Sequence, residues 1–235
     1  MGLWAAVRPE TRFAETFYAP AIPQKRTFRA GLALMTMTTT VTAVVLAGGR
    51  GERMGAADKG LQPLRGRSLV EWVLERIDPQ VDDLLIIANR NLERYLELGY
   101  PVLCDRIPGF AGPLAGLHAA LTQARSELVL AVPCDTPLLP PDLVSRLTAA
   151  LRQADAEIAV ARTRERVHAV ICLCKVSVSE RLAAFMDQGG RKVGEWQATL
   201  KVVYVDFDEQ EEAFRNVNTV DDLRNMESFV RPGPG

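Results

Sequence analysis

The feature that most constrains this chain is an apolar segment that runs directly into a glycine-rich, cationic loop. Residues 41–47 read VTAVVLA, and residues 48–60 read GGRGERMGAADKG. A strand this uniformly apolar is typical of a parallel sheet that is buried on both faces. Glycines let the backbone approach a polyanion closely, and loop N–H groups beside cations bind phosphate. The sequence therefore predicts a parallel strand followed by a phosphate-binding loop, with Arg53 and Lys59 as its cations.

Two familiar nucleotide-binding patterns do not fit this loop. The P-loop requires G-x-x-x-x-G-K-[ST], but Gly51 and Gly55 are too close together and Gly55 is followed by Ala56. The dinucleotide pattern G-x-G-x-x-G, begun at Gly49, meets Met54 where its last glycine should stand. The sequence therefore indicates neither a P-loop ATPase nor a dehydrogenase.

Strands and helices are predicted to alternate from Val41 onward, with short loops between them. Apolar runs predict strands over 41–47, 84–88, 101–104, 128–132, 158–161, 169–175 and 201–207. Helices are predicted over 69–77, 91–98, 113–124, 140–153, 178–186, 193–200 and 220–229. Ser68 and Thr219 are suitable N-terminal caps for two of them. This alternation predicts a doubly wound, mostly parallel α/β sheet that binds its ligands beyond the carboxyl ends of the strands.

Bulk composition narrows the class of protein further. The chain has 235 residues, 48% of them hydrophobic, and a formal net charge of −1, as expected for an ordinary globular domain. A charge balance so close to neutral gives no reason to expect a nucleic acid or a membrane as partner, and no apolar run has the length of a spanning helix. The four cysteines lie in or beside apolar runs. We therefore expect buried, reduced thiols and a cytoplasmic location.

The first 36 residues differ from the rest of the chain. They contain aromatic residues and prolines without periodicity, and their apolar run at 30–34 is too short for the core of a signal peptide. We expect residues 1–36 to be a disordered extension or a misassigned start, with Met35 or Met37 as a natural beginning. Residues 37–230 are expected to form a single domain.

Two aspartates that follow predicted strands are candidate ligands. Asp135 comes after the strand at 128–132, between two prolines, and a carboxylate at the end of a buried strand needs a partner or a metal. A hard oxygen ligand of this kind suits Mg²⁺, which takes one or two carboxylates together with substrate phosphates. Asp105 ends the strand at 101–104, and its carboxylate could accept hydrogen bonds from guanine or ribose. Either aspartate could instead be a turn residue.

The second half of the chain offers weaker candidates. Asn216 and Asn218 alternate, so their side chains point the same way in an extended segment, and such amides suit a heterocycle. Arg191 and Lys192 could hold a phosphate. Each of these could also be a plain turn residue. His168 could be a functional residue of the site or a histidine of the core or of a strand edge, and both interpretations stay open.

Several motifs together resemble the molybdenum cofactor guanylyltransferases, MobA-like nucleotidyltransferases with a Rossmann-like fold. The motifs occur in the same order as in that family, and the resemblance extends over about 38–229. They are LAGG at 46–49, RMG at 53–55, DKGL at 58–61, GPLAG at 112–116, PCDTP at 133–137 and NVNT at 216–219. The resemblance implies a doubly wound, three-layer αβα fold of the nucleotidyltransferase type.

The resemblance also implies a reaction. GMP would pass from GTP to molybdenum-molybdopterin, giving the guanine dinucleotide form of the cofactor and pyrophosphate, with Mg²⁺ as the metal. The GTP half would span about 41–150 and the pterin half about 151–230. Transient contact with the proteins that supply molybdopterin and mature molybdoenzymes is also implied.

Matching positions carry the implied roles. Arg53, Lys59 and Asp135 correspond to catalytic residues, with Asp135 as the metal ligand. The GTP-binding positions are Leu46, Ala47, Gly48, Gly49, Lys59, Asn89, Asp105 and Asp135. The pterin-side positions are Arg191, Lys192, Asn216 and Asn218.

The chain departs from the family pattern in two places. Family members often have His-Pro-Thr where this chain has His168-Ala169-Val170, so no role is carried over to His168. Ile87 stands where an asparagine can occur, which leaves Asn89 as the nearby polar contact. Cytidylyl transfer to the same cofactor and nucleotidyl transfer to a sugar phosphate are the alternatives. The pairs Gly48-Gly49 and Asp58-Lys59 favour guanylyl transfer.

Overall fold

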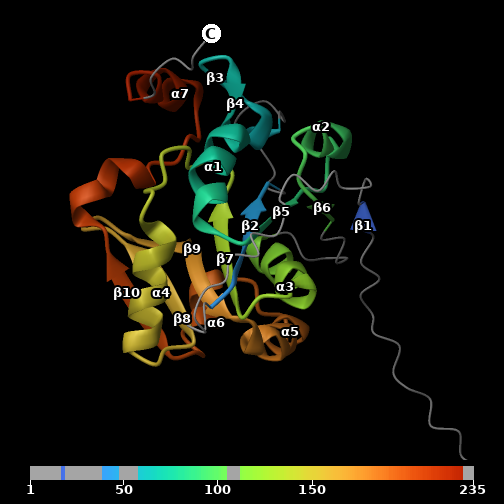
Figure 1. Ribbon diagram of the computed structural model, residues 1–235, viewed down its shortest axis with the longest axis vertical. Coiled ribbons are helices and arrows are strands. Elements are labelled where there is room, and N and C mark those ends of the chain that lie inside the picture. Colours follow the sequence, from blue (N-terminus) through green and yellow to red (C-terminus); the bar gives the residue numbers. More distant parts are fainter. Residues whose placement is uncertain (1–16, 19–38, 48–57, 105–111, 230–235) are drawn as a thin grey trace, which may run out of the picture.

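The computed structural model describes residues 17–18, 39–47, 58–104 and 112–229. Its centre is an eight-stranded sheet with the strand order β1-β6-β5-β2-β7-β9-β8-β10 (Figure 1). In that order the strands are Phe17–Tyr18, Val102–Leu103, Asp83–Ile87, Val41–Leu46, Leu128–Pro133, Val167–Lys175, Ile158–Arg162 and Val202–Asp206. Every strand expected between residues 41 and 207 is present, and β1 adds a short edge strand that pairs antiparallel with β6.

Most of the sheet is parallel, as the sequence predicts. Strands β6, β5, β2 and β7 run in one direction, and β10 pairs parallel with β8. Strand β9 is antiparallel to both of its neighbours, β7 and β8. Its direction follows from its connection, because the backbones of Thr163 and Arg166 bond each other across a tight turn from β8.

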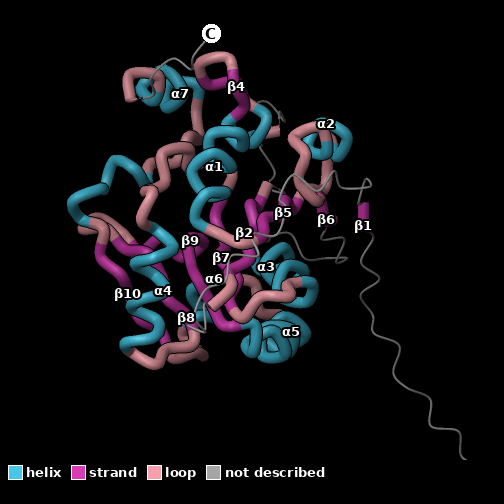
Figure 2. Tube along the Cα trace, in the orientation of Figure 1, coloured by secondary structure: helices cyan, strands magenta, loops and turns pink. Residues whose placement is uncertain are grey.

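Helices cover both faces of the sheet, which confirms the expected αβα layers (Figure 2). One face carries α1, α2 and α4, which are Leu69–Ile77, Leu92–Leu96 and Leu143–Gln153. The other face carries α3, α5 and α6, which are Pro113–Gln123, Ser179–Asp187 and Val193–Gln197. The central strand β2 serves both layers, since Ala43 and Val45 pack on the first face and Val44 on the second. In the described part of the chain, no helix is long and apolar enough to cross a membrane.

A third, smaller hydrophobic core packs the last described helix and the segment before it against the carboxyl edge of the sheet. A hairpin of β3 (Pro63–Leu64) and β4 (Arg67–Ser68), which the sequence analysis does not predict, packs with α7 (Val220–Met226). The Trp72 indole donates to the Leu64 carbonyl at 3.0 Å. The Arg65 guanidinium donates to the Glu227 carbonyl at the end of α7, at 2.6 and 2.9 Å. These contacts hold the segment before α7 close to the start of α1.

Both predicted helix caps are present. The Ser68 backbone N–H donates to the Glu71 carboxylate at 2.7 Å, in the expected capping box of α1. The Thr219 hydroxyl accepts from the Asp222 N–H at 3.1 Å and caps α7 in the same way. The 3-10 turns are Lys59–Leu61, Asp78–Gln80, Val176–Val178 and Asp208–Phe214.

His168 is a core residue on β9. Its ring lies 4.8 Å from that of Phe214, and its Nε2 is 3.1 Å from the Thr163 hydroxyl. Burial, reinforced by the nearby Arg166 charge, lowers the pKa of His168 to about 4. The imidazole is therefore neutral near pH 7 and serves the packing of the β8–β9 hairpin.

This buried histidine makes stability depend on pH. Unfolded His168 takes up a proton below about pH 6.5, whereas the folded protein resists protonation down to about pH 4. The free energy of unfolding should therefore fall by roughly 2 to 3 kcal/mol between pH 7 and pH 4.5 on account of this group. In urea titrations, His168→Gln should remove that part of the pH dependence and His118→Gln should keep it. Equal pH dependence in His168→Gln and the unaltered protein would contradict the assignment.

Candidate functional site

The site lies where the central strands β2 and β7 end. The two strands pair in parallel with Leu46 opposite Pro133, so their carboxyl ends reach the same edge of the sheet. The Cys134 N–H donates to the Leu46 carbonyl at 3.2 Å, and the Ala47 N–H donates to the Ile87 carbonyl at 2.8 Å. Ala47 and Asp135 thus lie just beyond the ends of adjacent strands.

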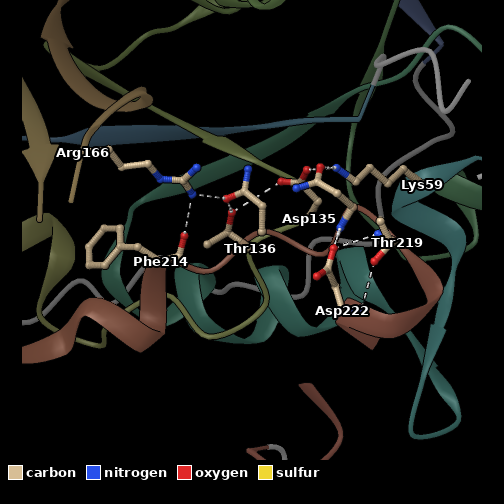
Figure 3. Close-up of polar contacts among 9 residues, drawn as sticks. Lys59, Asp135, Thr136, Arg166, Phe214, Thr219 and Asp222 are labelled. Atoms are coloured by element: carbon tan, nitrogen blue, oxygen red, sulfur yellow. Dashed lines mark hydrogen bonds and ion pairs between the residues drawn. The ribbon is translucent and has the colours of Figure 1, made fainter. Parts of the chain in front are cut away.

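Lys59 lies at one end of the row of polar contacts in Figure 3, beside Asp135. Its ammonium forms an ion pair with the Asp135 carboxylate and donates to the Asn218 side-chain oxygen at 2.5 Å. The two ionic side chains are 20% and 11% exposed, so their attraction is screened less than that of a surface pair. Three predicted site residues from distant parts of the chain therefore meet at one point.

Asn216 contacts Thr136 and Arg166, which Figure 3 shows on the side of Asp135 away from Lys59. Its oxygen accepts from the Thr136 hydroxyl at 3.1 Å and from the Arg166 guanidinium at 3.3 Å. Thr136 also lies 3.4 Å from an Asp135 oxygen. The Val217 N–H donates to the Asp135 carbonyl at 2.9 Å, so the backbone between the two asparagines is bound directly to the metal-ligand candidate.

The start of α7 fixes Asn218. The Asp222 carboxylate accepts from the backbone N–H groups of Asn218 and Thr219, both at 2.9 Å. Burial raises the pKa of Asp222, but these hydrogen bonds outweigh it and leave that pKa below its ordinary value. Asp222 is therefore a charged anchor for the asparagine that contacts Lys59.

Sequence reasoning assigns no site role to several residues that contact or adjoin this arrangement, among them Asp58, whose carboxylate accepts from the side chains of Asn91 and Tyr95. The full set is Asp58, Asn91, Tyr95, Thr136, Arg166 and Asp222. Asp58 and Thr136 directly adjoin Lys59 and Asp135 in the chain, which is a signal that the sequence does offer. Tyr95 and Arg166 carry no such signal, because only the fold brings α2 and the β8–β9 turn to the site.

The cysteines are not nucleophiles. All four are buried. Burial raises the pKa of Cys134 well above its usual range, and the neighbouring Asp135 charge raises it further. Burial likewise raises the pKa of Cys172 to about 12. These groups are protonated thiols near pH 7, which agrees with the reduced, buried thiols expected from the sequence.

Arg191 and Lys192 lie in the loop before α6, on the other face of the sheet. The Lys192 ammonium pairs with Glu195 at 2.8 Å, and the Arg191 guanidinium donates to the Gly190 carbonyl at 3.4 Å. Lys192 is therefore paired within its own turn and not with the Lys59–Asp135 cluster. The adjoining Val193 does reach the β2 end, where it lines a shallow apolar pocket with Leu46 and Pro113.

Several predicted residues lie outside the described part of the chain, and one predicted residue inside it, Asn89, is away from the Lys59–Asp135 contacts. Gly48, Gly49, Arg53 and Asp105 belong to segments that are not described. Asn89 follows β5, the strand beside β2, and is exposed.

The carboxylate of Asp135 suits a divalent cation that is shared with a substrate. Asp135 is 7% exposed, and its present partner is the Lys59 ammonium, a cation. Within the described residues, no group of three or more His, Cys, Asp or Glu side chains could hold a metal ion. A single carboxylate can serve a divalent cation that completes its coordination with substrate phosphate oxygens and water.

Comparison with known proteins agrees with this geometry. Residues 43–201 match the MobA-like NTP transferase domain. The molybdenum cofactor guanylyltransferase of Shewanella sp. (strain MR-4) is 46% identical over 194 residues, which cover 83% of this chain and 98% of that protein.

Two solved structures share the fold. The molybdopterin-guanine dinucleotide biosynthesis protein A from Archaeoglobus fulgidus matches with a TM-score of 0.67 and 26% identity, over 80% of this chain and 97% of that one. Rv0371c from Mycobacterium tuberculosis, solved in complex with manganese, matches with a TM-score of 0.61 and 22% identity, over 81% and 98% of the two chains. On the identity and coverage of the Shewanella relative and on the matched domain, this chain belongs to the molybdenum cofactor guanylyltransferases, a family of nucleotidyltransferases.

Proposed function

We propose that this chain transfers GMP from GTP to molybdenum-molybdopterin at the carboxyl ends of β2 and β7. A terminal phosphate oxygen of the pterin would attack the α-phosphorus of GTP. The bond from that phosphorus to the bridging β-phosphate oxygen would break, and pyrophosphate would leave. The observation that carries the proposal is the meeting of Lys59, Asp135 and Asn218 at the end of the phosphate-loop strand.

Lys59 would serve the triphosphate. Its ammonium sits between a carboxylate and an amide oxygen, both of which a phosphate oxygen could replace as partners. A cation fixed beside the leaving pyrophosphate stabilises the charge that develops as the bond breaks. Arg53 would assist from the glycine-rich loop, whose Gly48 and Gly49 follow the strand directly.

Asp135 would hold Mg²⁺. When bound, the ion would neutralise charge on the α- and β-phosphates of GTP. Asp135 would give up Lys59 to the phosphates as it takes the metal, so each of the two groups would keep a partner of opposite charge. The attacking phosphate is already an anion, so no strong general base is needed, in keeping with the neutral, buried His168.

The remaining candidates would divide between the two substrates. Leu46, Ala47, Asn89 and Asp105 would border GTP, and Arg191, Lys192, Asn216 and Asn218 would border the pterin. Asn216 and Asn218 support this division because they lie against Asp135 and Lys59 at the boundary of the two halves. Proteins that deliver molybdopterin and receive the finished cofactor would dock transiently.

The nucleotide preference is the first test. With molybdenum-molybdopterin and Mg²⁺, GTP should give pyrophosphate and a product heavier by GMP in mass spectrometry. CTP should turn over at least about tenfold more slowly, a difference of roughly 1.4 kcal/mol in transition-state binding. Faster turnover with CTP would reject guanylyl transfer.

The metal assignment predicts the effect of Asp135→Asn. This variant keeps the shape of the side chain and removes its charge, so metal-dependent pyrophosphate release should fall by roughly 100-fold or more. The variant should still fold, as measured by circular dichroism. A matched control is Asp155→Asn, at the far end of the sheet where Asp155 pairs with Lys175. Full turnover by Asp135→Asn would defeat the metal assignment.

The phosphate role of Lys59 predicts a second loss. Lys59→Met keeps much of the aliphatic length and should lower kcat/KM for GTP by roughly 100-fold. Lys201→Met is the control, because Lys201 pairs with Asp155 away from the site. Unchanged kcat and KM in Lys59→Met would contradict the role.

A further inference from the structure

The Asp58 carboxylate is held on both of its oxygens by one helix. The Tyr95 hydroxyl donates to one oxygen at 2.6 Å, and the Asn91 side-chain amide donates to the other at 3.0 Å. Asn91 and Tyr95 are four residues apart, so they lie on the same face of α2. Asp58 immediately precedes Lys59 and accepts the Leu61 N–H at its carbonyl, at 3.2 Å. Fixing Asp58 therefore fixes the start of the turn that carries Lys59.

Asn91 has a backbone conformation that serves this contact. It stands at the N-cap of α2 with φ 49° and ψ 36°, in the left-handed region, which asparagine tolerates better than most residues. An asparagine at this position usually bonds the first turn of its helix. Here the side chain makes no capping bond and reaches Asp58 instead. The local interaction that would stabilise α2 has been replaced by one that positions Asp58.

Tyr95 completes a packed connection from α2 to the end of β7. Its side chain is fully buried, and burial raises its pKa, so the hydroxyl remains a donor. A Cβ atom added at Gly60 would lie 2.5 Å from the Tyr95 hydroxyl oxygen and 3.2 Å from the Cys134 sulfur. The turn Lys59–Leu61 is therefore packed between Tyr95 and Cys134, the residue before Asp135. This close packing sets the separation of Lys59 from Asp135.

We infer that Tyr95 and Asn91 are positioning residues that aim the Lys59 ammonium through Asp58, and this inference rests on the proposed role of Lys59. Neither side chain bonds Lys59 itself; both act on the carboxylate of the residue before it. A lysine has a long, flexible side chain, so a well-defined ammonium position requires a rigid base as well as partners at its tip. Asp135 and Asn218 supply the partners, and α2 supplies the base.

The inference is tested with a double-mutant cycle. Tyr95→Phe removes one hydroxyl and should lower kcat/KM for GTP by about tenfold, since small misplacements of a catalytic group are costly. In the Lys59→Met background the same change should have less than about a twofold effect. Tyr204→Phe, at a 45% exposed tyrosine on β10, is the matched control. An equal loss in both backgrounds, or none in either, would overturn the inference.

Asn91→Gly provides a second variant should Tyr95→Phe fail to fold. Glycine accepts the left-handed conformation without strain, so this change removes only the side chain. Like Tyr95→Phe, Asn91→Gly should lower kcat/KM for GTP when Lys59 is present. In the Lys59→Met background it should change kcat/KM by less than about twofold. A full-strength loss with Lys59 absent would point to a role that does not pass through Lys59.

A readout that needs no turnover separates this inference from the proposed function. Trinitrobenzenesulfonate labels exposed amines, and peptide mass spectrometry reports the rate at each lysine. Lys59 should label at least about threefold faster in Tyr95→Phe, while Lys201 labels at its original rate. Unchanged Lys59 labelling would reject the positioning role. A protein that does not turn over GTP but shows faster Lys59 labelling would reject the proposed function and support the positioning.

Discussion

The parallel pairing of β2 with β7 at the centre of the sheet is the constraint on which the site depends. Because the strands run in the same direction with Leu46 opposite Pro133, the segments that follow them leave the same edge a few ångströms apart. Under the proposed function, the glycine-rich loop and Asp135 would then serve one bound molecule. An antiparallel pairing of these strands would send the two segments to opposite ends of the domain.

At that edge the charges of Lys59 and Asp135 are compensated by each other and not by solvent. Asp135 and Lys59 are both largely buried. Burying either charge without the other would cost free energy. The pair is therefore a stable arrangement in the protein by itself. It also consists of the two groups that a metal-bound triphosphate would need, a carboxylate for the cation and an ammonium for the phosphates. Binding would exchange partners and leave each of these two groups beside an opposite charge.

The structure draws together elements that sequence reasoning treats separately. The prediction from ordered motifs that Lys59, Asp135 and Asn218 belong to one site agrees with their contacts, while their catalytic roles remain predictions. The contact of Tyr95 with Asp58 is not predicted, since a lone tyrosine in a short helix reads as an ordinary core residue. The β3–β4 hairpin was missed for a similar reason: its strands have two residues each and no alternating pattern.

Local patterns in the sequence are enough to predict the class of fold, the order of most strands and helices along the chain, and the family. Periodicity, caps and ordered motifs are local properties, so they can be read without coordinates. The three-dimensional fold is needed to see that β9 runs antiparallel, that His168 belongs to the core, and that α2 bonds Asp58 beside Lys59. These facts depend on contacts between segments far apart in the chain, and such contacts follow from packing, which no local pattern encodes.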